Sequence, residues 1–186
     1  MVSAGSLTST QFADALTSES IQVTRLIHAA IMIGPLVFLM VIVVFASQNV
    51  GGFSPQVSDF EIMNILSTVH GILVLLAILL AQFLSGVLFS PDRLTHGEES
   101  IPVEMLAARC VALQRTAGIG RLAILEGASL FGLAVCFVGV TNHVIHAEAL
   151  YWFNAASTGL FLLFAAAVFP TRQNLIDWFE LRFGYR

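Results

Sequence analysis

Charge is scarce in this sequence. Only 11% of its 186 residues are charged, 57% are hydrophobic, and all eight basic residues are arginine because lysine is absent. In an ordinary soluble domain, about a quarter of the residues are charged. This composition excludes a soluble enzyme, a disordered chain and a nucleic-acid-binding protein, the last of which would need a basic face. The sequence instead indicates an integral membrane protein whose immediate partner is the lipid bilayer.

Cysteine and catalytic motifs are also scarce. The two cysteines, Cys110 and Cys136, lie far apart in apolar helical patterns, which does not resemble a disulfide framework. No Ser-His-Asp order, phosphate loop or nucleotide fingerprint is visible. We therefore predict no catalytic residues and expect the chain not to be an enzyme.

Four long apolar runs are present, at about 26–46, 62–89, 117–141 and 149–169. Each run reaches the roughly 20 residues that a helix needs to cross a bilayer. The runs are continuous rather than alternating, and in lipid a helix satisfies its own backbone hydrogen bonds. The sequence therefore predicts an all-α, four-span bundle over residues 22–170.

The sequence also predicts the structure of segments outside the four apolar runs. Residues 1–21 lack the positive region of a cleavable signal peptide and are predicted to be a cytoplasmic segment. Pro102 suits the first turn of a helix, and residues 103–141 are predicted to form one helix longer than the membrane is thick. Pro170 closes the fourth run, and residues 171–186 are predicted to form an interfacial helix.

The arginines fall on one side of the predicted bundle. None lies in the loops at about 47–61 and 142–148. The positive-inside rule then places both termini and the middle loop in the cytoplasm, as for a multi-pass protein of a bacterial inner membrane. The arginines are Arg25, Arg93, Arg109, Arg115, Arg121, Arg172, Arg182 and Arg186.

The two halves of the chain show an internal similarity. The first and third runs align at an offset of 93 residues, so that Ala30, Ile31, Gly34 and Phe38 match Ala123, Ile124, Gly127 and Phe131. Two duplicated hairpins would produce this pattern, and chance alignment of apolar helices would also produce it. Small residues line one face of the second and third runs, which indicates close packing in a bundle or in an oligomer.

Glu126 is the one carboxylate inside a predicted span. An ionisable group in a membrane is costly and is by default a candidate functional site. With Arg121 and Ser129 nearby in sequence, Glu126 is a candidate proton- or cation-binding residue. The alternative is a structural ion pair with Arg121 or Arg25.

Histidines supply two weaker candidates. His70 and His28 each suit a haem or chlorophyll metal as a single ligand, although a buried histidine more often makes hydrogen bonds, and their unequal depths argue against a shared haem. His143, His146 and Glu148 form H-x-x-H-x-E, which suits a divalent metal or a polar turn. The sequence leaves the identity of any cofactor open.

The segment Arg121 to Phe131 carries a resemblance. Its R-x-x-x-L-E-G pattern resembles an uncharacterised group of small four-helix bacterial membrane proteins, and the similarity covers mainly residues 109–180. Further matches to that group are Asn142 and Pro170-Thr171-Arg172. The resemblance implies the four-helix fold and no particular activity.

A second resemblance concerns the rotor-ring proteolipid subunits of ATP synthases. The third apolar run of this chain is similar to their ion-carrying helix in the spacing of its small, acidic and aromatic residues. In those subunits the carboxylate lies on the second helix of a hairpin, whereas here the glutamate lies on the first. The matching residues are Ala123, Glu126, Leu130, Phe131 and Gly132. This resemblance implies a proton or cation carried by Glu126.

These observations favour one function and leave two alternatives open. We expect a structural or accessory subunit of a larger membrane assembly, as a homo-oligomer or with other membrane subunits and without nucleic acid. The first alternative is a proton- or cation-binding, or translocating, protein that uses Glu126. The second is a haem- or chlorophyll-binding membrane subunit.

Overall fold

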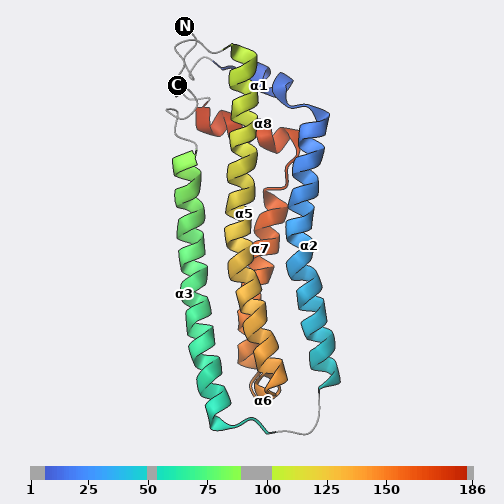
Figure 1. Cartoon of the computed structure of the whole chain (residues 1–186), viewed down its shortest axis with the longest axis vertical. Coiled ribbons are helices and arrows are strands. Elements are labelled where there is room, and N and C mark those ends of the chain that lie inside the picture. Colours follow the sequence, from blue (N-terminus) through green and yellow to red (C-terminus); the bar gives the residue numbers. More distant parts are fainter. Residues whose placement is uncertain (1–6, 50–53, 89–101, 184–186) are drawn as a thin grey trace. The chain divides into compact units, whose positions relative to one another are not determined.

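A computed structural model describes residues 7–49, 54–88 and 102–183, and these residues form helices without strands. The all-α class predicted from the sequence is therefore confirmed for the described part of the chain. The helices are α1 (Ser9–Ala15), α2 (Ser18–Gln48), α3 (Val57–Leu88), α5 (Val103–Thr141), α6 (Val144–Ala147), the 3-10 helix η2 (Ala149–Ala155), α7 (Ala156–Ala167) and α8 (Arg172–Phe183) (Figure 1).

Four helical stretches are long and apolar enough to cross a membrane, as the four apolar runs predicted. They are Ser18–Gln48, Val57–Leu84, Val103–Thr141 and Ala149–Ala167. The predicted end of the second run, at residue 89, lies outside the described residues. Residues 103–141 form the single helix α5 that Pro102 predicts, and at 1.5 Å per residue it is about 58 Å long.

The helix α2 begins earlier than its apolar run. It starts at Ser18 rather than near residue 26, because the Thr17 hydroxyl accepts a hydrogen bond from the Ser20 backbone N–H at 3.2 Å. A side-chain acceptor at this place satisfies one of the first N–H groups of a helix. Polar residues before Arg25 therefore extend α2 beyond the predicted span.

The fourth apolar run is not one regular helix. Residues 149–155 form the 3-10 helix η2, and only residues 156–167 are α-helical. The Asn154 side-chain amide donates to the Tyr151 carbonyl oxygen at 3.0 Å, and such local bonds compete with the α-helical pattern. The boundary between η2 and α7 is where the site described below is built.

The chain divides into two compact units, of which the first comprises residues 1–29, 82–121 and 168–186. Its described core joins α1 to α8 through Phe12 and Phe179, whose rings stack with centroids 4.4 Å apart. Arg172 donates to the Ala13 carbonyl oxygen at 3.0 Å, and Arg25 donates to that of Pro170 at 2.9 Å. The ring stack and the Arg172 bond fix the short helix α1 against α8, the helix predicted for the C-terminal segment, and the Arg25 bond joins α2 to the residues just before α8.

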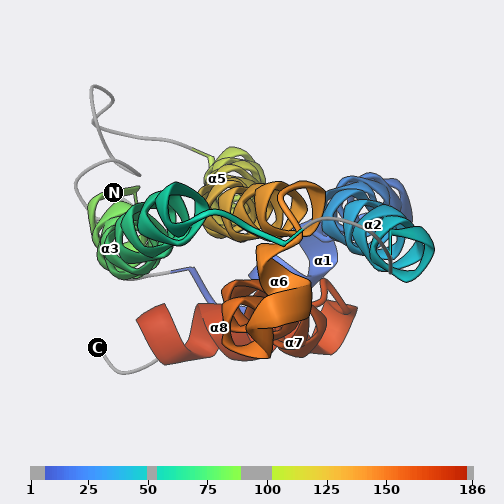
Figure 2. The ribbon, with the colours of Figure 1, turned by 90° about the horizontal axis from the view of Figure 1, so that it is seen from below.

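The second unit comprises residues 30–81 and 122–167. In it the second half of α5 lies between α2 and α3, and α7 packs on one side of α5 (Figure 2). The Ser129 hydroxyl of α5 donates to the Thr158 hydroxyl of α7 at 2.8 Å. The core of this unit is formed by residues such as Ile42, Met63, Leu133, Val140 and Val144. Large apolar side chains on the outer faces of α2 and α3 stay exposed, as expected of helices in contact with lipid.

A histidine-centred cavity as the candidate functional site

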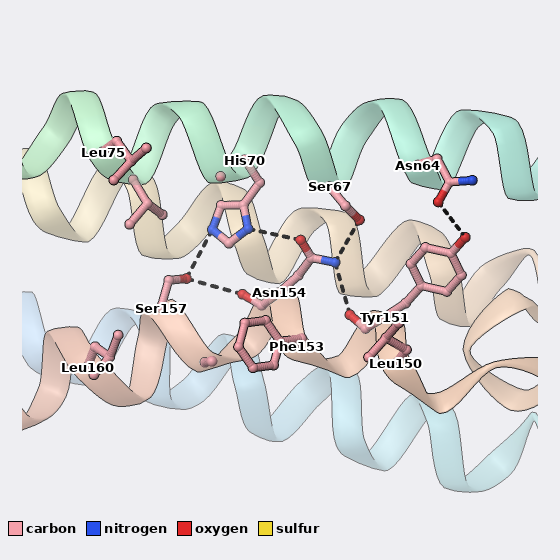
Figure 3. Close-up of a pocket in the computed structure, with 13 residues that line it drawn as sticks. Asn64, Ser67, His70, Leu75, Leu150, Tyr151, Phe153, Asn154, Ser157 and Leu160 are labelled. Carbon is pink, nitrogen blue, oxygen red and sulfur yellow. Dashed lines mark hydrogen bonds between the residues drawn. The ribbon is translucent and has the colours of Figure 1, made fainter.

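The second unit contains a cavity of about 480 Å³ between α3 and the segment formed by η2 and α7 (Figure 3). Its volume falls in the range of about 300–1,000 Å³ that is typical of small-molecule sites. The polar lining residues are Asn64, Ser67, His70, Tyr151, Asn154 and Ser157. The apolar lining residues are Gly71, Val74, Leu75, Leu150, Phe153, Ala156 and Leu160.

His70 is the centre of the polar side of this cavity. The residue is 5% exposed, and its ring lies 6.2 Å from that of Phe131 on α5. Its Nδ1 is 2.9 Å from Asn154 Oδ1, and its Nε2 is 3.1 Å from the Ser157 hydroxyl oxygen. Both ring nitrogens are therefore engaged across the interface between α3 and the η2–α7 segment.

The hydrogen bonds of Asn154 fix the tautomer of His70. The Asn154 amide nitrogen donates to the Ser67 hydroxyl oxygen at 2.9 Å as well as to the Tyr151 carbonyl. The amide oxygen, which only accepts, is thereby directed at His70 Nδ1, so Nδ1 must carry the proton. In this tautomer the acceptor lone pair of the ring is on Nε2, the nitrogen that faces Ser157.

The Ser157 hydroxyl faces that lone pair. Its second acceptor is the Asn154 carbonyl oxygen, also at 3.1 Å, so rotation of the hydroxyl selects between two acceptors. Ser157 lies in the first turn of α7 and is half-buried, at the wall of the cavity. The arrangement directs a serine hydroxyl at a histidine nitrogen, beside a space that a molecule can occupy.

The outer end of the cavity carries a second polar pair. The Tyr151 hydroxyl donates to Asn64 Oδ1 at 2.9 Å. This bond uses only the amide oxygen of Asn64, so its N–H groups stay free of it, and Ser67, which accepts from Asn154, retains its own O–H. The polar wall therefore offers hydrogen-bond donors, which suit a ligand with carbonyl-type oxygens.

The two predicted cofactor histidines have different surroundings. At His70 a metal would have to displace either Asn154 or Ser157, so the geometry does not favour a haem or chlorophyll ligand there. His28, in the first unit, is 5% exposed, and its ring packs edge-on against Phe169 at 5.2 Å. The expectation that buried histidines make hydrogen bonds is met at His70.

Two residues of the predicted ion site, Glu126 and Ser129, point in different directions. A β-carbon built at Gly34 of α2 would lie 3.3 Å from Glu126 Oε1, so Glu126 is directed at α2. Ser129 is directed at Thr158 of α7 instead. Within the described residues, Glu126 has no hydrogen bond or ion pair, and Arg25 donates to Pro170. The predicted grouping of Arg121, Glu126 and Ser129, and the alternative ion pair, stay predictions.

The H-x-x-H-x-E motif adopts a turn between α5 and η2. His143 has a left-handed backbone, with φ of 60°, and its ring centroid is 6.1 Å from that of His146. Over residues 7–49, 54–88 and 102–183, no three His, Cys, Asp or Glu side chains are grouped to hold a metal ion. The metal site of His143, His146 and Glu148 and its alternative, a polar turn, stay predictions.

Comparison with protein-family models, with curated proteins and with solved structures finds no match to this chain. The described residues form helices, and four helical stretches are long and apolar enough to cross a membrane, as in a multi-pass membrane protein. The resemblances given above therefore stay predictions.

Sequence reasoning missed most of this site. His70 was singled out, but its partners Asn154 and Ser157 are 84 and 87 residues away along the chain. One signal is available in the sequence: besides the alignment of the first and third runs, the second and fourth runs align at an offset of 90 residues. That alignment matches Asn64, Ser67 and Thr68 with Asn154, Ser157 and Thr158. Those positions are polar in both hairpins, and four of the six line the cavity.

Proposed function

We propose that this chain is an integral membrane protein that binds the acyl-ester part of a membrane lipid in the cavity between α3 and η2–α7. The single observation that carries the proposal is the composition of the cavity wall. One side is polar and offers hydrogen-bond donors from Asn64 and Ser67, and the other side is apolar. A molecule with ester carbonyl oxygens and a hydrocarbon chain satisfies both parts.

The position of the polar groups along α3 supports the same ligand. Glu61 is the last charged residue before the apolar part of α3, and Asn64 follows it by about 5 Å at the helical rise. His70 lies about 14 Å beyond Glu61, near the middle of a hydrocarbon core about 30 Å thick. A lipid ester at the level of Ser67, which lies between Asn64 and His70 on α3, would thus direct its acyl chain along the apolar wall.

The rim of the cavity favours entry from the bilayer. The four large side chains Leu75, Leu150, Phe153 and Leu160 are between 64% and 78% exposed. Apolar side chains exposed on spanning helices contact hydrocarbon, so a lipid reaches the cavity without crossing water.

Native mass spectrometry of protein extracted from vesicles of phosphatidylethanolamine and phosphatidylglycerol tests the proposal. A β-carbon at Gly71 would meet nothing within 4 Å, so Gly71→Phe places a ring in the cavity without a clash at its base. We expect one retained lipid on the natural chain and none on Gly71→Phe. Gly159→Phe is the matched control, because Gly159 is equally open and does not line the cavity. Equal lipid retention by all three proteins would refute the proposal.

A second candidate function is proton binding at Glu126. Pro35 lies inside α2, directly after the glycine that faces Glu126, and is buried. Proline lacks an N–H group, so the Ile31 carbonyl loses its helical donor near this carboxyl group. A protonated carboxyl in a membrane span is a hydrogen-bond donor, and such helix breaks accompany ion sites in other membrane proteins.

A hydrophobic carbodiimide tests this candidate, because it reacts with a protonated carboxyl group in a membrane. We expect labelling at Glu126 in vesicles and its loss in Glu126→Gln. Glu19, which lies in the first turn of α2 before the apolar part of that helix, is the internal control. Absence of labelling at Glu126 would exclude a neutral carboxyl there.

Topology and assembly belong to the same proposal. The one-sided arginines support both termini in the cytoplasm of a bacterium, and reporter fusions at the C-terminus test this. A fused green fluorescent protein should fluoresce, whereas a fused alkaline phosphatase should be inactive. The accessory role in a larger assembly stays a prediction, and the native mass in mild detergent is its test.

A further inference from the structure

We propose that Ser157 is a nucleophile toward the ester carbonyl of the lipid, with His70 as its general base and Asn154 as the residue that orients His70. The inference rests on the proposed lipid site and adds a reaction to it. It departs from the expectation that the chain is not an enzyme.

The three residues meet the geometric conditions for an activated serine. A nucleophile and its base lie within about 2.6–3.2 Å in such sites, and a third residue orients the base. Here the Ser157 hydroxyl oxygen is 3.1 Å from His70 Nε2, and His70 Nδ1 is 2.9 Å from Asn154 Oδ1. All three also line the same cavity.

Attack by Ser157 needs the tautomer of His70 that carries its proton on Nδ1, and this is the tautomer that Asn154 fixes. Because Asn154 holds the proton on Nδ1, the Nε2 lone pair is directed at the serine hydroxyl before any substrate binds. Asn154 cannot turn its amide, since its nitrogen is held by Ser67 and by the Tyr151 carbonyl. A polar contact that only holds two helices together would require neither a fixed proton on His70 Nδ1 nor a fixed orientation of the Asn154 amide.

The reaction balances as an ester hydrolysis. The Ser157 oxygen forms a bond to the carbonyl carbon as its proton moves to His70 Nε2. The ester C–O bond then breaks, and the departing alcohol takes the proton from Nε2. Water gives a proton to Nε2 and its oxygen adds to the acyl carbon. Cleavage of the bond to Ser157 releases a fatty acid, and the proton returns to the serine.

The cavity wall also supplies a donor for the charge that develops on the carbonyl oxygen. Ser67 lies one turn before His70 on the same helix and retains its O–H after accepting from Asn154. Donors of this kind are most effective where water is excluded, as in an apolar cavity.

An alkyl fluorophosphonate tests the inference, because its phosphorus reacts with activated serines and not with ordinary ones. We expect the probe to label Ser157 of the full-length protein in vesicles, as located by peptide mass spectrometry. Ser157→Ala should remove the label, and His70→Gln should lower the labelling rate about 100-fold or more.

Ser129→Ala is the matched control for packing. It removes a buried hydroxyl that bonds to another helix at 2.8 Å but does not contact His70. We expect Ser129→Ala to be labelled at the natural rate. Thermal unfolding of each variant in detergent shows which of them are folded.

The results separate the inference from the lipid proposal. A folded natural chain that retains lipid but is not labelled would overturn the inference and leave the lipid site intact. Labelling that survives His70→Gln would equally overturn it. A chain that is labelled at Ser157 but retains no lipid would refute the lipid site and keep the nucleophile.

Discussion

Gly132 of α5 lies directly against His70 of α3. A β-carbon at residue 132 would be 2.5 Å from His70 Nε2 and 2.5 Å from the Asn154 carbonyl oxygen. Atoms do not approach so closely without displacement, so only glycine permits this packing of α5 against the site. The backbone of α5 therefore determines where the histidine ring lies.

Replacing Gly132 by alanine should consequently disturb both stability and the site. We expect Gly132→Ala to destabilise the protein by about 1–3 kcal/mol, as overpacking does, and to shift the midpoint of thermal unfolding downwards. Gly127→Ala is the control on the same helix, because a β-carbon there would meet nothing within 4 Å. That control should be neutral or slightly stabilising, since alanine favours helix more than glycine does. If Gly132→Ala and Gly127→Ala changed the midpoint of thermal unfolding equally, Gly132 would not lie in close contact with His70.

Tyr151 and Asn64 should be coupled energetically. Tyr151→Phe removes the hydroxyl that donates to Asn64 Oδ1 at 2.9 Å. Hydrogen bonds between membrane helices contribute about 0.6 kcal/mol on average and up to about 1.7 kcal/mol. We expect a coupling of this size from a double-mutant cycle with Asn64→Ala, measured by unfolding in detergent. Additive losses, with no coupling, would argue against this bond.

The sequence predicted the helices better than it predicted the site, and the reason is physical. Apolar length alone determines a spanning helix, so α2, α3 and α5 include the described parts of the predicted runs, although each begins before its run. At the break between η2 and α7, the Asn154 side chain donates instead to the backbone carbonyl of Tyr151, which hydropathy does not detect. His70 was recognised as unusual because it is polar in a span. Its role depends on partners from another helix, which only the packing specifies.

Asn154 should affect the orientation of His70 rather than the reaction directly. In Asn154→Ala the ring loses its Nδ1 acceptor, so the tautomer is no longer fixed and fluorophosphonate labelling of Ser157 should slow by at least about 10-fold. In Asn154→Asp a carboxylate oxygen can accept from Nδ1 again, and labelling should be partly restored. The measurement is the labelling rate against pH, because a purely structural residue would change the yield of folded protein but not the profile. Identical profiles for all three proteins would contradict the role of Asn154.

The docking of α1 should depend on one aromatic pair. Phe12 is fully buried and stacks on Phe179 at an interplanar angle of 9°, and truncating a buried phenylalanine costs about 3–5 kcal/mol. A helix of seven residues is not stable by itself, so α1 cannot compensate for the loss of this packing. We therefore expect Phe12→Ala to release α1, so that amide hydrogens of residues 9–15 exchange rapidly while those of α7 keep their protection. Phe83→Ala truncates a phenylalanine that is 68% exposed and should leave the exchange of α1 unchanged. If α1 remained protected in Phe12→Ala, the hydrogen bond from Arg172 to Ala13 would have to be the main attachment.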